Sequence, residues 1–370
     1  MSTLKYGLVG CGMMGQEHIR NIRLLSDTAI GAIFEPNKEM RSAAAELAPE
    51  AIIVDSIEEL LAIDDIDCLV ITSPNHTHIE NLQKIASVRV LPVLVEKPLA
   101  TDPADEATIL DLQASYSAPI WVAMEYRYMP PLAEFIKRAH EVTGGITMLS
   151  IREHRFPFLE KVNDWNRFNR YSGGTFVEKC CHFFDLMRFI LKSEPTSIMS
   201  SAAQSHNHLD ERYNGETPDI IDNGFAVVNF TNGSRALLEL CMFAEGSRYQ
   251  EEICAVGKLG KIECKIPGPT RFWAEHLGPP PVAKLVISPR NPSGPVEIEI
   301  PVDPELTAAG DHHGSTFYQH RKFQQVVLGN AVPDVTLEDG WRAVKMGMAA
   351  QQSALQQKAL KLDFTDTGEP

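Results

Sequence analysis

The chain has 370 residues, of which 44% are hydrophobic and 22% are charged, and its formal net charge is −15. A chain of this length exceeds one typical hydrophobic core, so two domains are expected. The acidic balance argues against a nucleic acid or an anionic membrane surface as partner. The N-terminus shows no apolar signal segment, and no apolar run approaches the ~18 residues of a membrane span, so we expect a cytoplasmic protein.

The first motif is a glycine-rich turn between a short apolar run and a helix-compatible segment. The run LKYGLVGCGMMGQE near the N-terminus places Gly10, Gly12 and Gly15 in the pattern GxGxxG. In a strand–turn–helix unit, the first glycine allows the sharp turn, the second lets a pyrophosphate approach, and the third lets the helix pack closely. Free N–H groups at the helix start would bind the phosphates. We therefore predict a dinucleotide site here, with Met13 and Met14 among its contacts.

An acidic residue follows the second apolar run and bears on the choice of cofactor. Glu35 comes directly after the strand-like run at 29–34. A carboxylate at that strand end accepts hydrogen bonds from the adenosine ribose hydroxyls and repels a 2′-phosphate. Lys38 is nearby, but no arginine follows Glu35 directly. The sequence therefore favours NAD over NADP.

Strand-like and helical stretches continue to alternate up to residue 124. Strands are expected at 52–54, 67–72, 90–95 and 120–124, and helices at 56–61, 77–87 and 102–115. Nearly continuous apolar strands that alternate with helices predict a parallel sheet covered on both faces, so residues 1–124 should form a doubly wound Rossmann domain. Its ligands should lie at the carboxyl ends of the strands. Those ends carry Ser73-Pro74-Asn75, Glu96-Lys97-Pro98 and residues 125–127.

The pattern changes after residue 125, where long strand-like runs predominate. Strands are expected at 146–156, 196–203, 224–230, 234–243, 252–256, 261–266, 283–287 and 296–300, and helices at 131–142, 174–191, 315–328 and 337–355. This predicts an α+β domain over 125–370, built on a large, mainly antiparallel open sheet. Such a sheet usually covers one face with its own helices and hides the other, so a homodimer or homotetramer is expected.

Lys97 is the first candidate for catalysis. It ends a predicted strand and lies between Glu96 and Pro98. Desolvation in the cofactor crevice is expected to lower its pKa, which would suit it to donate a proton to an oxygen or to polarise that oxygen. The alternative interpretation is a surface lysine paired with Glu96.

A second group of candidates lies on the helix expected at 174–191. Glu178, His182 and Asp185 follow one another at spacings of four and three residues, so a regular helix would place them on one face. A carboxylate one turn from a histidine orients the ring and raises its basicity, which makes a general base. The alternative is a surface ion pair, but the neighbouring phenylalanines and the preceding Gly173-Gly174 favour a buried helix.

Metal and disulfide chemistry are not predicted. The seven cysteines are scattered, with no CxxC pair, and read as reduced packing residues. His206 and His208, and the pair His312-His313, lack further ligands at a recognisable spacing.

Taken together, these motifs resemble a known family. GLVGCGMMG, Ser73-Pro74-Asn75, Glu96-Lys97-Pro98 and the segment GGTFVEKCCHFFD resemble the Gfo/Idh/MocA oxidoreductases, which include glucose–fructose oxidoreductase and inositol dehydrogenases. The motifs are specific as far as Asp185, and the architecture extends the resemblance to the C-terminus. The resemblance implies a nicotinamide-binding Rossmann domain and an open-sheet domain that forms dimers or tetramers.

The resemblance also assigns roles to individual residues. It implies that Lys97 is the catalytic lysine, often followed by a cis bond to proline, and that His182 is the acid/base. Glu178 stands where the family usually has Asp and is a partner of His182 or a substrate ligand. His154 matches a strand position that faces substrate in inositol dehydrogenases. Phe156 replaces a polar residue, so the substrate is expected not to be inositol itself.

The complete predicted site follows from these motifs. The predicted catalytic residues are Lys97, His182 and Glu178. The predicted cofactor contacts are Gly10, Gly12, Met13, Met14, Gly15, Glu35, Ser73, Pro74, Asn75, His78, Glu96 and Lys97. The predicted substrate contacts are Lys97, Arg127, His154, Glu178, His182 and His313.

Three functions remain open at this point. The first is an NAD-dependent oxidoreductase that transfers hydride from a secondary alcohol of a sugar, sugar derivative or cyclitol. The second is a redox-neutral, NAD-dependent glycosidase that oxidises C3 transiently, eliminates the anomeric substituent and adds water. The third is a non-catalytic NAD-binding sensor, which is disfavoured because both Lys97 and His182 are present.

Overall fold

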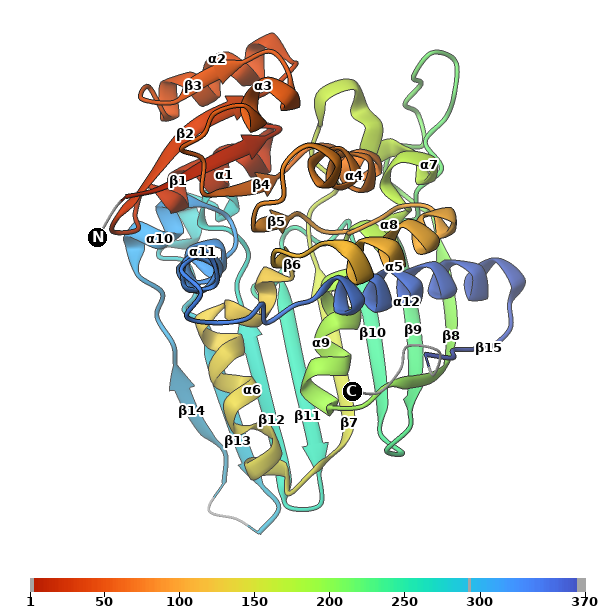
Figure 1. Cartoon of the computed structure of the whole chain (residues 1–370). Helices are drawn as coiled ribbons and strands as arrows, with labels where there is room; N and C mark the ends of the chain where they lie inside the picture. The colour runs from red at the N-terminus through yellow and green to blue at the C-terminus, as the bar shows by residue number, and fades with distance from the viewer. Residues whose placement is uncertain (1–2, 292–293, 365–370) are drawn as a thin grey trace.

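The first sheet of the protein is parallel and six-stranded. The computed structural model describes residues 3–291 and 294–364. The sheet order is β3-β2-β1-β4-β5-β6 (Figure 1), which is the Rossmann order, and every strand pair in it is parallel. The strands are β1 (Leu4–Val9), β2 (Thr28–Phe34), β3 (Ile52–Val54), β4 (Cys68–Ile71), β5 (Val93–Val95) and β6 (Ile120–Val122). The helices between them are α1 (Met13–Ile22), α2 (Lys38–Leu47), α3 (Ile57–Leu61), α4 (His78–Val88) and α5 (Glu106–Ser115).

The apolar strands of this sheet explain its double covering. All residues of β4, β5 and β6 are buried, as expected for strands with no polar face. The predicted doubly wound domain is therefore confirmed. All six carboxyl ends lie along one edge, because the strands run parallel.

The second sheet has nine strands in the order β14-β13-β12-β11-β7-β10-β9-β8-β15. They are β7 (Ile146–His154), β8 (Pro195–Ala203), β9 (Asn223–Phe230), β10 (Arg235–Cys241), β11 (Glu251–Gly257), β12 (Gly260–Ile266), β13 (Lys284–Pro289), β14 (Val296–Glu299) and β15 (Leu360–Lys361). Within the described residues, only β7 and β10 pair in parallel. The predicted mainly antiparallel sheet is confirmed.

Helices cover one face of this sheet. Figure 1 shows α6 (Pro130–Thr143) and α9 (Cys181–Leu191) lying across it, and α12 (Leu337–Gln356) packs against β8. Residues of β9 alternate between buried and exposed, as expected when only one face is covered. The opposite face exposes Met148, Met199, Phe225 and Val227.

The C-terminal helices return to the first sheet. Phe323 of α11 (Ser315–Val327) and Trp341 of α12 belong to the same apolar core as Trp121 of β6. The backbone N–H of Val122 donates to the carbonyl of Val335 at 3.2 Å. A boundary at residue 124 therefore separates the two sheets, but the core of the first sheet includes later residues.

The helix expected at 174–191 is interrupted. The structure forms α8 (Thr175–Glu178) and α9, with Lys179 and Cys180 between them. The Cys180 N–H donates to the Thr175 carbonyl, five residues back, so the regular helical spacing is lost. Glu178 and His182 consequently belong to two separate helices, and this corrects the prediction of one regular helix that carries both.

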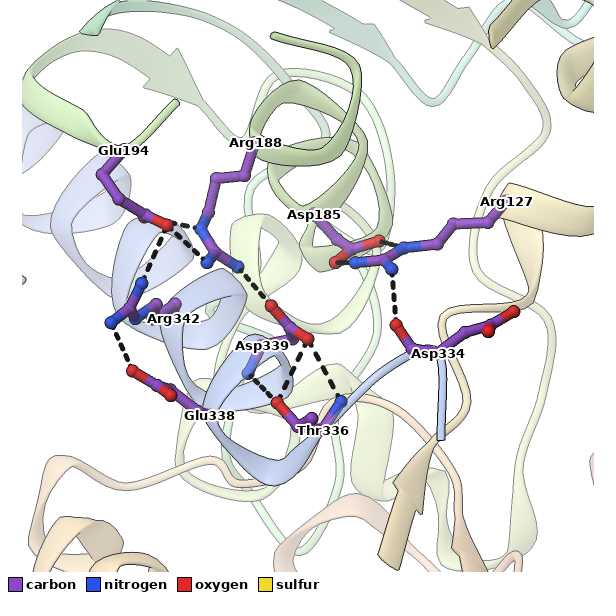
Figure 2. Close-up of polar contacts among 9 residues, drawn as sticks. All are labelled: Arg127, Asp185, Arg188, Glu194, Asp334, Thr336, Glu338, Asp339 and Arg342. Atoms are coloured by element: carbon purple, nitrogen blue, oxygen red, sulfur yellow. Dashed lines mark hydrogen bonds and ion pairs between the residues drawn. The ribbon is translucent and has the colours of Figure 1, made fainter. Parts of the chain in front are cut away.

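A buried ion pair connects α9 to the segment after β6. Arg127 donates from Nε and Nη2 to the Asp185 carboxylate at 2.7 and 2.5 Å, and from Nη1 to the Asp334 carbonyl at 2.9 Å (Figure 2). Arg127 and Asp185 are both buried. Arg127 is thus bound to the scaffold, and it does not line the cavity described below. This corrects its prediction as a substrate contact, and Asp185 likewise does not extend the face of His182.

A second ion-pair cluster, also drawn in Figure 2, holds the start of α12. Arg188 of α9 donates to Glu194 at 2.8 and 2.7 Å and to Asp339 at 3.2 Å. Asp339 also closes a capping box with Thr336 at the first turn of α12. Together these contacts fix α9, and therefore His182, relative to both sheets.

We predict that Arg127→Met lowers the free energy of unfolding by about 3–5 kcal/mol, because Asp185 is left buried without its partner. Urea denaturation measures this change. Arg170→Met is the matched control, since Arg170 pairs with Glu216 at the surface, and little change is expected. If Arg127→Met left the stability unchanged and raised the KM for substrate, Arg127 would be a substrate contact, and this prediction would be wrong.

Candidate active site

The glycine-rich turn after β1 has the geometry that a bound diphosphate needs. Gly10 has a φ of +89°, and a Cβ there would lie 2.7 Å from Ser73 Cα. A Cβ on Gly15 would lie 2.7 Å from the Gly10 oxygen, so this residue allows α1 to approach closely. A Cβ on Gly12 would meet nothing within 4 Å, and no side chain caps α1 there. Open space thus lies over the uncapped first turn of the helix.

Glu35 lies beside this turn, at the end of β2. Its Oε2 accepts from the Cys11 N–H at 2.6 Å, and its Oε1 accepts from the Asn37 N–H at 2.7 Å. Each carboxylate oxygen keeps a second lone pair for a ribose hydroxyl. These residues fit NAD, with the start of α1 holding the pyrophosphate and Glu35 holding the adenosine ribose.

Two predicted cofactor contacts, His78 and Glu96, form hydrogen bonds with other residues of the protein instead. The ring nitrogens of His78 lie 2.8 Å from the Pro98 carbonyl and 2.9 Å from the Ser73 carbonyl, so His78 joins the loops after β4 and β5. Glu96 Oε1 lies 2.8 Å from His18 Nε2, and its Oε2 accepts from the Lys97 N–H at 3.2 Å. Both residues therefore support the loops that carry Lys97.

The remaining predicted cofactor contacts follow β4 or begin α1. Ser73 Oγ accepts from Thr77 and Asn81, Pro74 precedes η1 (Asn75–Thr77), and the buried Asn75 amide donates to the Ser172 carbonyl at 3.4 Å. Met13 and Met14 line the cavity that also contains Lys97.

That cavity lies where elements of both sheets meet. It encloses about 850 Å³ of empty space, including its open mouth. Its wall includes the predicted residues Lys97, Glu178, His182 and His313, together with Tyr126, Arg155, Phe156, Lys161, Lys179, Glu251 and His312. The structure therefore brings Lys97 and His182, 85 residues apart in the sequence, to one site.

Lys97 is a cation in this cavity. Its Nζ donates to the Glu178 carbonyl at 3.0 Å, and its bond to Pro98 is cis. Burial alone would lower the pKa of a lysine. The pKa of Lys97 is nevertheless raised, because the acidic groups around it favour the ammonium; they are Cys181, Glu178, Glu96 and Glu125. This corrects the expected lowering, and Lys97 is protonated at neutral pH.

His182 is a neutral base. Its ring stacks on Tyr126, with centroids 4.1 Å apart and an interplanar angle of 4°. Burial, and then the charges of Lys97 and Lys179, hold the pKa of His182 well below its ordinary value. Its Nε2 lies 3.5 Å from Glu125 Oε1, whereas Nδ1 has no hydrogen-bond partner among the described residues. Nδ1 is buried, and the lowered pKa keeps the imidazole neutral near pH 7, so the ring is available as a base.

The carboxylate partner of His182 is Glu125, and Glu178 does not take this role. Burial and the charge of Glu96 raise the pKa of Glu125 to about 7. Neither Glu125 oxygen has a hydrogen bond in the described part of the chain. The prediction of Glu178 failed because the break between α8 and α9 removes the helical spacing. Glu125 lies three residues beyond β6 and directly follows the strand expected at 120–124, and this position at a strand's carboxyl end was the sequence signal for it.

Glu178 instead forms part of the cavity wall. Its side chain is buried, and burial raises its pKa. Its Oε2 has no hydrogen-bond partner within residues 3–291 and 294–364. A buried polar atom of this kind usually has an unseen partner, and a substrate hydroxyl would satisfy it.

The predicted contact His154 lies on the wrong face of β7. His154 Nε2 is 3.0 Å from Glu239 Oε1 on the sheet face that carries no helices. Its neighbour Glu153 points inward, where it is fully buried and lies 2.9 Å from the Lys179 ammonium. Successive strand residues alternate between faces, so an offset of one residue moves a side chain out of the site. This corrects the prediction for His154.

The histidine pair after α10 (Pro304–Ala309) contributes two different groups. His313 Nε2 lies 2.8 Å from the Pro267 carbonyl, while the ring lines the cavity. His312 Nδ1 lies 2.8 Å from Glu17 Oε1. Although burial opposes it, this carboxylate raises the pKa of His312 to about 9, so His312 is a further cation in the wall.

The described residues hold neither a candidate metal centre nor a disulfide. They contain no group of three or more His, Cys, Asp or Glu side chains placed to hold a metal ion. All seven cysteines are free.

Among the helices of the described segments, none combines the length and apolar character needed to cross a bilayer.

Two family models match the chain. One is described as the oxidoreductase family, NAD-binding Rossmann fold, and matches residues 4–124; the other is its C-terminal alpha/beta domain and matches residues 139–362. The chain belongs to the Gfo/Idh/MocA oxidoreductase family. Its first domain is accordingly the NAD-binding Rossmann fold of that family, in agreement with the geometry at Gly12 and Glu35.

Individual members of the Gfo/Idh/MocA family match with moderate identity. The rhizopine catabolism protein MocA of Rhizobium meliloti is 25% identical over 55% of this chain and 62% of its own length. Inositol 2-dehydrogenase of Corynebacterium glutamicum ATCC 13032 is 34% identical over 56% of this chain and 61% of its own length. Both matches span less than two thirds of the relative. Inositol 2-dehydrogenase 2 of Saccharopolyspora erythraea is 30% identical over 76% of this chain and 79% of its own length.

Solved structures show the same fold. A putative myo-inositol dehydrogenase from Sinorhizobium meliloti 1021 superposes with a TM-score of 0.77 at 21% identity, over 98% of this chain and 100% of that one. GenD2 from gentamicin A biosynthesis, in complex with NAD, superposes with a TM-score of 0.77 at 18% identity, over 98% and 97%. At this level of identity the likeness concerns the fold.

Proposed function

We propose that the protein is an NAD-dependent oxidoreductase that oxidises a secondary alcohol of a sugar, sugar derivative or cyclitol. One observation carries the proposal: a lysine ammonium and a neutral histidine line the same cavity, beside the turn that fits NAD. The names of the inositol dehydrogenase relatives support an alcohol of this class.

The two residues divide the work on the reacting hydroxyl. Bound NAD supplies the hydride acceptor for the carbon that is oxidised. His182 accepts the hydroxyl proton as the carbonyl forms. The Lys97 ammonium binds the same oxygen and stabilises the negative charge that develops on it. Glu125, 3.5 Å from Nε2, offsets the positive charge that His182 acquires.

Glu178 and Phe156 shape the rest of the substrate region. The unpartnered Oε2 of Glu178 would accept a hydrogen bond from a second hydroxyl. Phe156 presents an aromatic ring to the cavity.

A redox-neutral glycosidase is the second candidate, and a further hollow beside the cavity favours it, because a leaving group would need such room. In that reaction hydride returns to the sugar and no NADH accumulates. Absorbance at 340 nm and assay of the released sugar distinguish the two functions on the same substrate panel. A non-catalytic sensor would show NAD binding without either signal.

We predict that Lys97→Met and His182→Ala each lower kcat by roughly 10²–10⁴-fold while NAD affinity is retained, because each removes a group that acts on the reacting oxygen. The double variant should lose less than the product of the two single losses, as expected for residues that act as a unit. Steady-state kinetics and NAD titration calorimetry measure both effects. Full activity of either single variant on a verified substrate would disprove the assignment.

We predict that kcat/KM falls as the pH drops through about 7, because Glu125 takes up a proton there and no longer stabilises the charge on His182. Glu125→Gln does not titrate, so its acidic limb should move below pH 7, towards the lowered pKa of His182. Glu178→Gln is the matched control and should leave the limb in place. If the acidic limb moved in Glu178→Gln and stayed in place in Glu125→Gln, the titrating partner of His182 would be Glu178 and not Glu125.

We also propose a homodimer or homotetramer that covers the open sheet face. Phe225 is 53% exposed and Met199 is 56% exposed there, and an apolar face of this kind is usually hidden in an assembly. Light scattering at micromolar concentration should give a multiple of 41.1 kDa, and Phe225→Lys should shift it towards one chain. Leu355→Lys, which is exposed on α12, should have no such effect. A monomeric wild-type protein would refute this proposal.

A further inference from the structure

The wall of the active-site cavity contains more basic side chains than its chemistry on the alcohol requires. Its lysines, its arginine and its imidazolium are Lys97, Arg155, Lys161, Lys179 and His312. Lys179 lies 2.9 Å from the Glu153 carboxylate, and His312 lies 2.8 Å from that of Glu17. The proposed function assigns Lys97 to the reacting oxygen. Arg155 and Lys161 are therefore the two cations of the wall without a role.

The acidic side chains of the same wall offer these two cations little compensation. Asp311 is paired with Arg271 at 2.6 Å, and Glu17 is paired as described above. Burial raises the pKa of Glu251 to about 7, so this carboxyl group is about half protonated at neutral pH. Burial also raises the pKa of Glu178. The wall therefore keeps an excess of positive charge at neutral pH.

Lys161 has no counter-ion. It is half-buried and directly precedes η4 (Val162–Arg167), in a loop that the Asn166 amide holds by donating to the Leu159 carbonyl at 3.0 Å. Its ammonium makes no hydrogen bond or ion pair with any described residue, and the ring of Trp165 lies 6.0 Å away, from Nζ to the centroid. A cation taken out of water without a partner is unfavourable, so an anionic ligand at this place would be stabilising.

The neighbours of Lys161 define the charge that such a ligand should carry. Burial lowers the pKa of Lys161; the carboxyl group of Glu178 opposes this effect, and the charges of Lys97 and Arg155 add to it. The other cations are thus close enough to be felt. Because Glu178 supplies part of the counter-charge, the remaining excess matches one negative charge, that of a carboxylate, better than the nearly two charges of a phosphate monoester.

Arg155 has hydrogen-bonding groups that suit a carboxylate. Its Nε donates to the Phe156 carbonyl at 3.3 Å, and its Nη1 donates to Glu153 Oε1 at 3.5 Å, whereas Nη2 donates to none of the described residues. Glu153 is held more closely by Lys179, so it is a weak partner for Arg155. The guanidinium lies 4.4 Å from the centroid of the Phe156 ring, which fixes its plane. An oriented guanidinium with free N–H groups binds a planar carboxylate well.

We propose that Lys161 and Arg155 bind a carboxylate of the substrate, so that the alcohol oxidised at Lys97 and His182 belongs to a sugar acid. This inference rests on the proposed oxidoreductase function, whose substrate class it narrows. Arg155 supplies directed N–H groups to the carboxylate, and Lys161 supplies a further positive charge. The Glu178 side chain stays available to a hydroxyl of the same substrate.

Pairs of substrates that differ in one group test this proposal: glucose with glucuronate, galactose with galacturonate, and glucitol with gluconate. The wild-type protein should use at least one acid with a kcat/KM about tenfold or more above that of its neutral partner, as expected for hydrogen bonds to charged groups. Lys161→Met should lower this ratio about tenfold by raising the KM for the acid. Lys161→Arg should largely keep it, because the charge is retained.

Lys258→Met is the matched control. It removes the same charge from an exposed lysine just beyond the end of β11 that lies farthest from Glu251 and the cavity, and it should leave the ratio unchanged. Glucuronamide, the uncharged analogue of glucuronate, should behave like glucose. Glucose 6-phosphate should be a poorer substrate than glucuronate.

Calorimetry on the NAD-loaded protein separates failure of this inference from failure of the proposed function. If no sugar is turned over, binding of an acid that is weakened in Lys161→Met and kept in Lys161→Arg and Lys258→Met would still support the carboxylate site. The inference is overturned if the neutral partners are preferred or bound equally well throughout, or if glucuronamide equals a preferred glucuronate. Equal losses for acid and neutral sugar in Lys161→Met, or a preference for the phosphate, would also overturn it.

Discussion

The positive charge of Lys97 sets the protonation of the groups around it. Cys181 and the carboxyl groups of Glu178, Glu96 and Glu125 raise the pKa of Lys97 and outweigh the cost of its burial. In return it contributes to the lowered pKa of His182. The result is a cation and a neutral base side by side, the combination that removal of an alcohol proton needs. With an uncharged Lys97, His182 would be easier to protonate, and the developing alkoxide would lose its counter-charge.

The fold delivers this arrangement through neighbouring strand ends and one buried helix. β5 and β6 pair in the sheet, so Lys97 and Glu125, just beyond their carboxyl ends, come close together. His182 begins α9, which the Arg127–Asp185 ion pair and the Arg188 cluster hold against the segment after β6 and the start of α12. The C-terminal helices α11 and α12 thus support the site indirectly, because they complete the apolar core of the Rossmann sheet.

Much of this organisation could be predicted from the sequence, because its signals are local. Alternating apolar strands and helices predicted the first sheet, long strand-like runs predicted the second, and the glycine spacing located the dinucleotide turn. The family motifs pointed to Lys97 and His182, and the structure brings both to one cavity. The sheets can be predicted because apolar residues recur with the period of strands and helices. The turn and the catalytic residues can be predicted because their motifs combine residue types and spacings that are uncommon elsewhere.

The errors arose where tertiary contacts override local spacing. The segment 174–191 has the pattern of one helix, but Lys179 turns inward to Glu153 and the helix breaks before Cys181. His154 was assigned by motif position, and the alternation along β7 places Glu153 at the site instead. The raised pKa of Lys97 depends on carboxylates from distant segments, which no spacing rule reveals.

The protonation state of His182 tests the account most directly. Two-bond ¹H–¹⁵N correlation spectra of histidine-labelled, NAD-loaded protein at pH 7, with His182→Ala to assign the signal, report which ring nitrogens carry protons. We predict a neutral ring that carries a proton on only one of its two nitrogens. A doubly protonated imidazolium at pH 7 would contradict the account, because His182 could not then accept the proton of the alcohol.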